Sequence, residues 1–253
     1  MRYAFPMEKE RDLRTYLNEY NLLPFERSAE KYRRKAVVGA LRELQPQSLI
    51  EVGCGQDSIF NYLDPAILGT IVEPIESLTR SQDLDRRLPN VKVITSLFES
   101  VPVGAIERAD VVLLSSILHE VNDAKLLIET SSRFLQSDGA IVIIVPNAWS
   151  IHRFVGERKL IISKLDEQSD TQKKMQQQQL VYSPKSLNVF LENCGLYVEN
   201  LKTFFPKLSS HSQMQDFLDS NLLDDGFLDR INDLSEYLEP TGSEIIAVAR
   251  RRK

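Results

Sequence analysis

The sequence predicts a doubly wound α/β fold, and two observations support that prediction. Short apolar runs recur along the 253-residue chain, and each run ends at a turn residue or a polar stretch. Stretches with apolar residues at helical spacing separate most of these runs. Runs that are apolar on both faces are typical of parallel strands covered by helices on each side. Strands that alternate with helices form a doubly wound sheet.

Seven apolar runs are predicted to be strands. They cover residues 48–52, 69–72, 91–95, 111–115, 140–145, 196–205 and 244–249. Six of these runs are shorter than the roughly ten residues that a helix needs, which favours buried strands. The sequence therefore predicts a sheet of seven strands.

Two of the intervening helices have clear end signals. One follows Asn122 or Asp123, either of which suits an N-cap, and Gly139 is predicted to close the turn after it. The other begins after Ser183 as N-cap and ends before Gly195. These signals place helices in two of the gaps between strands.

Three regions depart from the alternation. Residues 1–35, rich in charged and aromatic side chains from residue 7 onward, are predicted to form an N-terminal helical cap on a domain that spans 36–253. Residues 147–182 and 206–240 are expected to be additions near the ligand crevice, the first of them a lid. The glutamine-rich stretch 168–179 is interpreted as an exposed helix or a mobile loop.

Composition narrows the class of protein. The net charge of -5 argues against a broad nucleic-acid surface, which needs a basic face. No apolar run reaches the roughly 18 residues of a membrane span, and Met1 to Arg14 lacks the apolar core of a signal peptide. The two cysteines show no metal-ligand spacing, so no metal is expected. We expect a cytoplasmic protein without a membrane or nucleic-acid partner, and the oligomeric state stays open.

The sharpest motif follows the first predicted strand. Gly53 and Gly55 allow a tight turn and the close approach of a ligand to the backbone. Glu51 precedes them and Glu73 ends the second predicted strand, where a carboxylate can accept both hydroxyls of a ribose. A ligand with a cationic sulfonium and an ammonium group would benefit from Glu51. An ordinary strand-to-helix turn is the alternative interpretation of the glycines.

The residues after this turn bear on the type of ligand. Asp57 stands where a dinucleotide site would favour a further glycine and no extra negative charge. Together with Glu51, it disfavours a nicotinamide-dependent dehydrogenase.

These residues make the chain resemble the class I S-adenosylmethionine-dependent methyltransferases. Residues 51–55 match the first motif of that family, and Glu73 matches its ribose-binding acid. The resemblance implies a Rossmann-like seven-stranded sheet with an antiparallel last strand and S-adenosylmethionine as the cofactor. The cofactor contacts that it implies are Glu51, Gly53, Cys54, Gly55, Glu73, Leu97, Phe98 and Ser115, with backbone groups acting at Leu97 and Phe98.

Two histidines are candidates for catalysis. His119 follows the fourth predicted strand, which in the resembled family borders both the cofactor and the acceptor. A neutral histidine can take a proton from the acceptor. A histidine that only hydrogen-bonds beneath the cofactor is the alternative interpretation. His152, after the fifth strand, has the same two interpretations.

The segment 145–153, Val-Pro-Asn-Ala-Trp-Ser-Ile-His-Arg, resembles a subset of class I enzymes associated with sugars and surface-polysaccharide precursors. A Gln-Met pair at 213–214 is similar to a second feature of that subset. We therefore expect polysaccharide biosynthesis as the context and a small-molecule acceptor. The predicted acceptor contacts are Asn147, Arg153, Tyr182 and His211, with His152 and Arg153 able to hold an anionic acceptor.

The predicted function is methyl transfer to an oxygen, in preference to a nitrogen, of a small polar molecule. A sugar or a phosphorylated precursor of a surface glycan is the first candidate for the acceptor. An RNA or protein methyltransferase would share the fold. A non-catalytic nucleoside-binding protein would retain the glycines without turnover.

Overall fold

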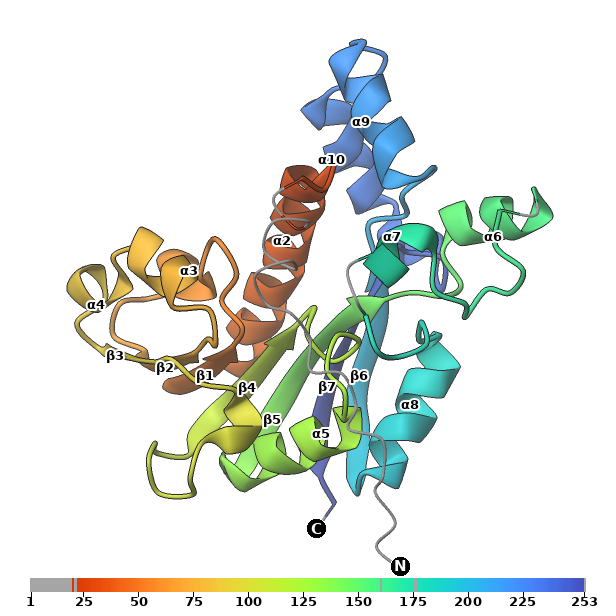
Figure 1. Ribbon diagram of the computed structural model, residues 1–253. Helices are drawn as coiled ribbons and strands as arrows, with labels where there is room; N and C mark the ends of the chain where they lie inside the picture. The colour runs from red at the N-terminus through yellow and green to blue at the C-terminus, as the bar shows by residue number, and fades with distance from the viewer. Residues whose placement is uncertain (1–19, 21, 160, 175–176, 253) are drawn as a thin grey trace, which may run out of the picture.

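The computed structural model describes residues 20, 22–159, 161–174 and 177–252, and in these ranges the strands form one seven-stranded sheet of order β3-β2-β1-β4-β5-β7-β6 (Figure 1). The strands are β1 (Ser48–Val52), β2 (Leu68–Val72), β3 (Val91–Ile94), β4 (Ala109–Ser115), β5 (Leu135–Pro146), β6 (Leu196–Phe204) and β7 (Glu244–Arg251). Strand β7 pairs antiparallel with both β5 and β6, whereas the pairs among β1 to β5 are parallel. The predicted doubly wound, seven-stranded fold with an antiparallel last strand is confirmed.

The strand order reverses between β1 and β4. The chain winds from β1 outward to β3 and then returns to β4 on the other side of β1. Such a reversal opens a crevice beyond the carboxyl ends of the strands, where folds of this kind bind their ligands. The glycine turn after β1 and the segment after β4 therefore lie at the same edge of the sheet.

Helices connect the strands and surround the sheet. The α-helices in the described part of the chain are α2 (Glu26–Leu44), α3 (Glu76–Ser81), α4 (Leu84–Arg87), α5 (Ala124–Arg133), α6 (Ile151–Arg158), α7 (Asp170–Lys174), α8 (Pro184–Asn193), α9 (His211–Asp219) and α10 (Asp225–Asp233). Short 3₁₀ turns are η1 (Ile59–Tyr62), η2 (Phe98–Ser100) and η3 (Ser235–Tyr237). Asp123 caps α5 by accepting from the Leu126 amide at 2.8 Å. Ser183 caps α8 in a reciprocal pair with Ser186.

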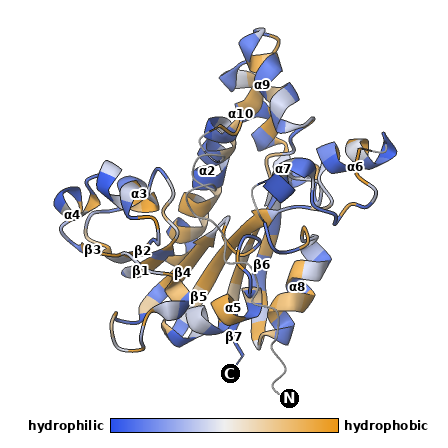
Figure 2. Ribbon diagram, viewed as in Figure 1, coloured by the Kyte–Doolittle hydropathy of each residue, from blue (hydrophilic) through white to orange (hydrophobic). Residues whose placement is uncertain are grey.

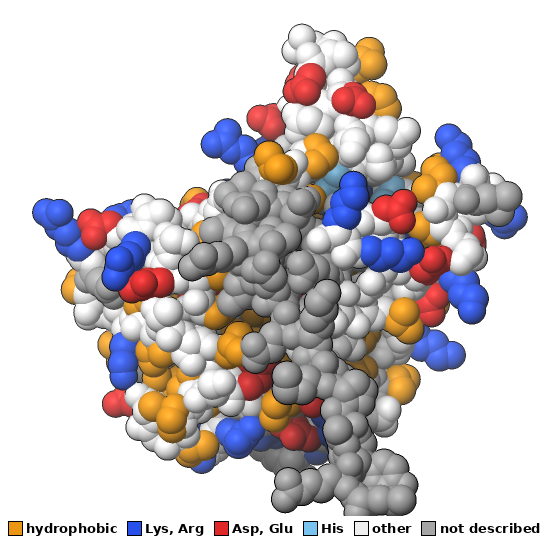
Figure 3. Space-filling view, in the orientation of Figure 1, with side chains coloured by type: hydrophobic (Ala, Val, Ile, Leu, Met, Phe, Trp, Pro, Cys, Tyr) orange, Lys and Arg blue, Asp and Glu red, His pale blue; other side chains and the backbone are white. Residues whose placement is uncertain are grey.

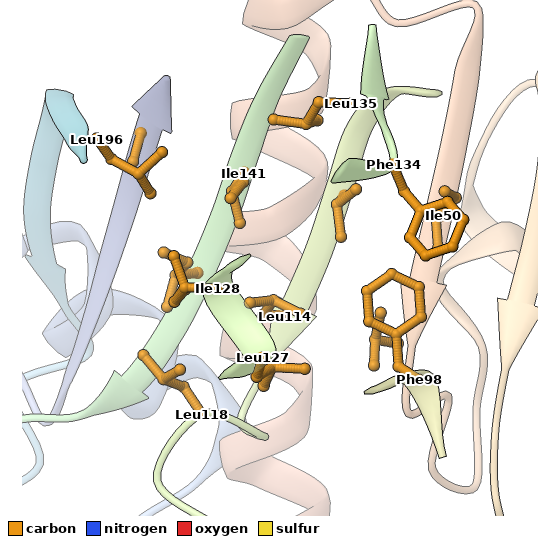
Figure 4. Close-up of a cluster of buried hydrophobic side chains, with 14 of the residues drawn as sticks. Ile50, Phe98, Leu114, Leu118, Leu127, Ile128, Phe134, Leu135, Ile141 and Leu196 are labelled. Atoms are coloured by element: carbon orange, nitrogen blue, oxygen red, sulfur yellow. The ribbon is translucent and has the colours of Figure 1, made fainter. Parts of the chain in front are cut away.

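Two hydrophobic clusters cover the two faces of the sheet. One packs the strands against α5 and α8, which lie in front of the sheet in Figure 1. Its labelled side chains in Figure 4 include Leu127 and Ile128 of α5. The other packs the opposite face against α2, where Tyr32 stacks on Phe205 with ring centroids 4.1 Å apart. Figure 2 shows the resulting apolar strands between more polar helices. The core thus fixes the sheet rigidly beneath the crevice.

Gly139 corrects one prediction about a helix end. Helix α5 ends at Arg133 with Phe134 as its C-cap, and Gly139 lies inside β5. A Cβ at Gly139 would sit 2.9 Å from the Asp110 carbonyl oxygen. The glycine is therefore needed for close approach of β5 to β4, and not for a turn.

The two segments that broke the alternation lie at the carboxyl edge of the sheet. Residues 147–182 carry α6 and α7, and residues 206–240 carry α9 and α10, which stand above the arrowheads of β4 and β5 (Figure 1). Of the predicted cap 1–35, residues 1–19 lie outside the described residues, and α2 runs without a break across position 35. Within the described ranges, every helix is too short or too polar to cross a bilayer.

Candidate active site

A cavity of about 620 Å³ lies at the carboxyl edge of the sheet. The residues after β1, β2 and β4 line one part of it, and α6 and the start of α9 line another. In Figure 3, histidine side chains (pale blue) are visible at the base of the projection formed by α9 and α10. The cavity joins the predicted cofactor and acceptor segments into one space.

The glycine turn has the backbone geometry that the sequence predicted. Gly53 and Gly55 have φ values of 74° and 54°, in the left-handed region that favours glycine. The Gly53 amide donates to the Val72 carbonyl at 2.9 Å and so continues the pairing of β1 with β2. A Cβ at Gly53 would lie 3.0 Å from Ile117 Cδ1, whereas one at Gly55 would meet nothing within 4 Å. A ligand can therefore approach the backbone at Gly55.

Glu51 lines the cavity and also fixes the loop after the glycines. Its carboxylate accepts from Ser58 Oγ at 2.5 Å and from the Ile59 amide at 2.9 Å. The side chain is 4% exposed, and burial raises the pKa of Glu51 to about 7. A cationic ligand would favour the ionised form.

Glu73 brings a second carboxylate to the same turn. Its Oε1 accepts from the Ile75 amide at 2.8 Å, and Cys54 Sγ lies 4.0 Å from its Oε2. Burial raises the pKa of Glu73, while the amides of Ile75, Cys54 and Gly55 oppose that rise. Cys54 is itself buried, which raises the pKa of its thiol and leaves it a packed side chain on the cavity wall. Glu51, Cys54 and Glu73 thus meet at the glycine turn.

Helix α2 contacts this turn through Asp57. Arg34 Nη1 donates to Asp57 Oδ2 at 2.5 Å, as does the Tyr62 hydroxyl, and Asn61 Nδ2 donates to Asp57 Oδ1 at 2.9 Å. The negative charge of Asp57, which disfavours a dinucleotide site, is therefore paired with an arginine inside the protein. The loop after β1 is held from two sides, by Glu51 and by α2.

The adjacent arginine of α2 contacts the other part of the cavity. Arg33 Nε and Nη2 donate to the two carboxylate oxygens of Glu244 at 3.0 and 2.9 Å, and its Nη1 donates to Glu26 at 3.1 Å. These three side chains line the cavity next to the start of β7. Helix α2 thus contacts both parts of the cavity.

Of the remaining predicted cofactor residues, one lines the cavity and two do not. Ser115 ends β4 and lines the cavity. Phe98 is buried in the core with its ring centroid 5.3 Å from that of Phe134. Figure 4 shows the two rings side by side. Leu97 is 54% exposed, and neither Leu97 nor Phe98 is among the residues that line the cavity. Adenine contacts from their backbone groups stay a prediction.

His119 is 4% exposed and lines the cavity just beyond β4. Its Nε2 lies 4.0 Å from Glu120 Oε1. The His119 carbonyl accepts from the amides of Gln178 and Gln179 at 3.3 and 3.2 Å. The end of the glutamine-rich stretch, expected to be an exposed helix or a mobile loop, therefore packs on the His119 loop and helps to position it.

Asn147 and Arg153, predicted to contact an acceptor, have their polar groups engaged within the protein. Asn147 Nδ2 donates to the carbonyls of Pro240 and Gly242 at 2.8 and 2.7 Å. Arg153 Nε donates to the Leu165 carbonyl at 2.8 Å, and its other nitrogens donate to the Glu167 carbonyl and to Gln172 Oε1. Both residues line the cavity, but the structure uses their side chains to hold the adjoining loops. Acceptor contacts from these two side chains stay a prediction.

The other three predicted site residues on this side differ in whether they line the cavity. Tyr182 packs its ring 5.6 Å from Phe190 and is not among the cavity-lining residues; burial raises its pKa to about 12. His152 and His211 both line the cavity, and burial lowers the pKa of each well below the ordinary value. Both imidazoles are therefore neutral near pH 7 in this structure.

Lys207 is a cavity residue that sequence reasoning missed. It follows β6, is 4% exposed, and lines the cavity beside the start of α9. Burial lowers the pKa of Lys207 to about 7. The one signal in the sequence is its position after a predicted strand, inside Phe-Phe-Pro-Lys-Leu, where an apolar setting surrounds a single charge.

The central part of the chain matches a known family model. Residues 50–143 match the model of a family described as "Methyltransferase domain". That segment runs from β1 into β5 and contains the glycine turn, Glu73 and His119. A search of curated proteins finds no match.

Solved structures share the fold at low sequence identity. The plantazolicin methyltransferase BamL, solved with a desmethyl analogue and S-adenosylhomocysteine, has a TM-score of 0.60 and 15% identity, with 95% of this chain and 91% of that chain covered. The 1,6-didemethyltoxoflavin-N1-methyltransferase of Burkholderia thailandensis also has a TM-score of 0.60, with 10% identity and 99% and 93% coverage. A putative S-adenosylmethionine-dependent methyltransferase of Listeria monocytogenes reaches 0.57, with 15% identity and 88% and 100% coverage. Residues 50–143 therefore match a methyltransferase domain, and the chain as a whole shares the fold of these solved methyltransferases.

Proposed function

We propose that this protein transfers the methyl group of S-adenosylmethionine to an oxygen, in preference to a nitrogen, of a small polar acceptor. The observation that carries the proposal is the meeting of two buried carboxylates, Glu51 and Glu73, at a turn of two left-handed glycines. This combination suits a nucleoside that carries a positive charge.

The residues at the turn fit such a cofactor. A Cβ at Gly55 would point into open space, so the backbone there can contact a ligand. Glu73, which follows β2, would accept the ribose hydroxyls. Glu51 has a pKa of about 7 in the absence of a cation, and a bound sulfonium or ammonium group would lower it. The cofactor supplies the methyl group as an electrophile bound to sulfur.

The chain itself contributes alignment and a proton acceptor. Methyl transfer forms a bond from the acceptor oxygen to carbon and breaks the bond from carbon to sulfur, which leaves S-adenosylhomocysteine. The acceptor hydroxyl must also lose its proton. His119 lines the cavity next to β4, and a neutral imidazole there would take that proton. His152 is a second candidate on the acceptor side.

A sugar or a phosphorylated precursor of a surface glycan is the acceptor that we propose first. The resemblance of residues 145–153 to polysaccharide-associated enzymes favours it. The similar solved enzymes act on other small molecules, as the toxoflavin precursor bound to the Burkholderia enzyme illustrates. Both observations favour a small acceptor over RNA or protein.

Calorimetry with S-adenosylhomocysteine tests the proposal. We expect saturable binding to the wild-type protein and none with NAD. Glu73→Leu should weaken binding about tenfold or more, because it removes two hydrogen bonds to the ribose. Glu76→Leu, an exposed acid three residues away, is the matched control and should leave binding unchanged. Absence of binding by the wild type contradicts the proposal.

A second measurement separates the alternatives. Protein incubated with methyl-labelled S-adenosylmethionine and cell extract should place label in the small-molecule fraction. Label in RNA or protein would favour a macromolecular methyltransferase. Cofactor binding without label in any fraction would favour a non-catalytic binding protein.

A further inference from the structure

Lys207 is a buried lysine in the wall of the cavity. No described residue forms a hydrogen bond or an ion pair with Lys207 Nζ, although the side chain is only 4% exposed. Burying an amine in this way costs free energy unless a ligand or water satisfies it. A natural protein that keeps such a group in a cavity usually uses it.

Two further polar side chains meet at the same place. His152 Nδ1, on α6, is buried and has no hydrogen-bond partner among the described residues. His211 is the first residue of α9, and the start of that helix lines the cavity from Ser209 to Gln213. The pKa values of His152 and His211 are both lowered in part by Lys207, so the three groups lie close together.

The neighbouring acids do not neutralise this cluster. Glu26 and Glu244 are the acids whose charges act on Lys207, and Arg33 already pairs with both. Arg33 and Arg153 add positive charge at Lys207. The two arginines offset the two acids, so protonation of Lys207 gives this point one net positive charge beside the imidazoles of His152 and His211, in a chain whose net charge is -5.

The cluster lies away from the cofactor carboxylates. Lys207 follows β6, and five steps in the strand order separate β6 from β2, which ends before Glu73. At about 4.8 Å per step, the strands themselves are roughly 24 Å apart. A group bound by Lys207 thus belongs to the molecule that occupies the acceptor part of the cavity.

We propose that Lys207, His152 and His211 bind an anionic group, a phosphate or a carboxylate, of the methyl acceptor. This inference rests on the proposed function, because it assigns the acceptor end of the same cavity. The anion accepts hydrogen bonds from the lysine amine and the imidazoles, and the positive end of α9 adds to the attraction. The acceptor is therefore an acidic small molecule, held by its charge while its hydroxyl faces the cofactor.

Binding an anion should also change protonation at Lys207. Its pKa of about 7 means that the amine is largely neutral above pH 8. A bound phosphate or carboxylate favours the charged form, so the protein should take up a proton as the anion binds. The charged and titratable groups that face Lys207 are Glu26, Arg33, Glu244, Arg153, His152 and His211.

Titration with inorganic phosphate and, separately, with acetate tests the site. The protein is first saturated with S-adenosylhomocysteine, and each anion is then followed by calorimetry at pH 8 in two buffers of different ionisation enthalpy. We expect saturable binding of at least one anion with uptake of a proton. Stronger phosphate binding would indicate a phosphorylated acceptor, and stronger acetate binding would indicate a carboxylic acid.

Three variants decide the role of Lys207. Lys207→Met should weaken anion binding at least ~10-fold and abolish the proton uptake, and Lys207→Arg should stay within about threefold of the wild type. Lys202→Met, which removes an exposed lysine from β6, is the matched control and should bind as the wild type does.

Binding of S-adenosylhomocysteine to each variant confirms that it is folded. If the wild type binds S-adenosylhomocysteine but neither anion, or if Lys207→Met binds the anion as well as the wild type, the anion site is wrong while the methyltransferase proposal stands. If the wild type fails to bind S-adenosylhomocysteine, the proposed function itself fails.

Discussion

The two ends of the cavity are built in different ways. At the cofactor end, each buried carboxylate has partners from its own turn, as Glu51 does with Ser58 and Ile59. At the acceptor end, the Lys207 amine and His152 Nδ1 form no hydrogen bond with the side chains or backbone of the described residues. The first end is satisfied before any ligand binds. The second carries polar groups that no described residue satisfies, so we expect it to determine the choice of acceptor.

The largest expected effect lies at the cofactor end. Gly53→Asp should weaken binding of S-adenosylhomocysteine about 100-fold or more, since a cost of about 3 kcal/mol corresponds to that ratio. Gly53 has a φ of 74°, and its Cβ would press on Ile117. Gly104→Asp, at another left-handed but open position, is the control and should bind normally. An unchanged dissociation constant for Gly53→Asp would refute the assignment of the cofactor end.

A smaller effect is expected between the two ends. His119→Ala should lower kcat about 100-fold while the affinity for S-adenosylhomocysteine stays within about threefold, because a base acts on the acceptor proton and not on cofactor binding. The rate of label transfer to the acceptor fraction and calorimetry measure the two quantities. Equal losses in kcat and in the affinity for S-adenosylhomocysteine would mean that His119 has a structural role and supports cofactor binding.

The smallest effect concerns the stability cost at the acceptor end. The folded pKa of Lys207 lies near 7 and its ordinary value is 10.5, so between these pH values the unfolded chain binds more protons. The destabilisation is complete below pH 7 and disappears as the pH rises toward 10.5.

Lys207→Met should therefore raise the Tm by about 2–4 °C at pH 6, with a gain that shrinks above pH 7. Thermal unfolding at several pH values measures the gain, and Lys202→Met should show none. A gain that is independent of pH would mean that Lys207 is not titrating in a buried site.

Sequence alone reached the fold and the residues of the cofactor end because both depend on local patterns. Apolar runs define the strands, and Gly53, Gly55 and Glu51 lie within five consecutive positions. The turn that they form needs no distant partner to be recognised. Which of these residues contact the cofactor is still a prediction.

Distant contacts explain what the sequence did not reveal. Gly139 suggested a helix end, but pairing of β5 with β4 extends the strand to Leu135. The partners of Asn147 are carbonyls more than 90 positions away, so its role was not visible locally. Lys207 is unusual only because the fold buries it in the cavity, near charged residues of α2, α6 and β7. Long-range packing decides whether a polar residue faces a ligand or braces a loop.

Helix α2 has a consequence for how ligands enter and leave. Two consecutive arginines of this helix, Arg33 and Arg34, form ion pairs with Glu244 and Asp57, which line two parts of the same cavity. Helix α2 therefore holds these two parts of the cavity at a fixed separation. Neither part can move alone without breaking one of the two ion pairs. Ligands must therefore enter and leave the cavity past segments that α2 does not hold. A change in the ion pairs that anchor α2 would alter the fit of both the cofactor and the acceptor.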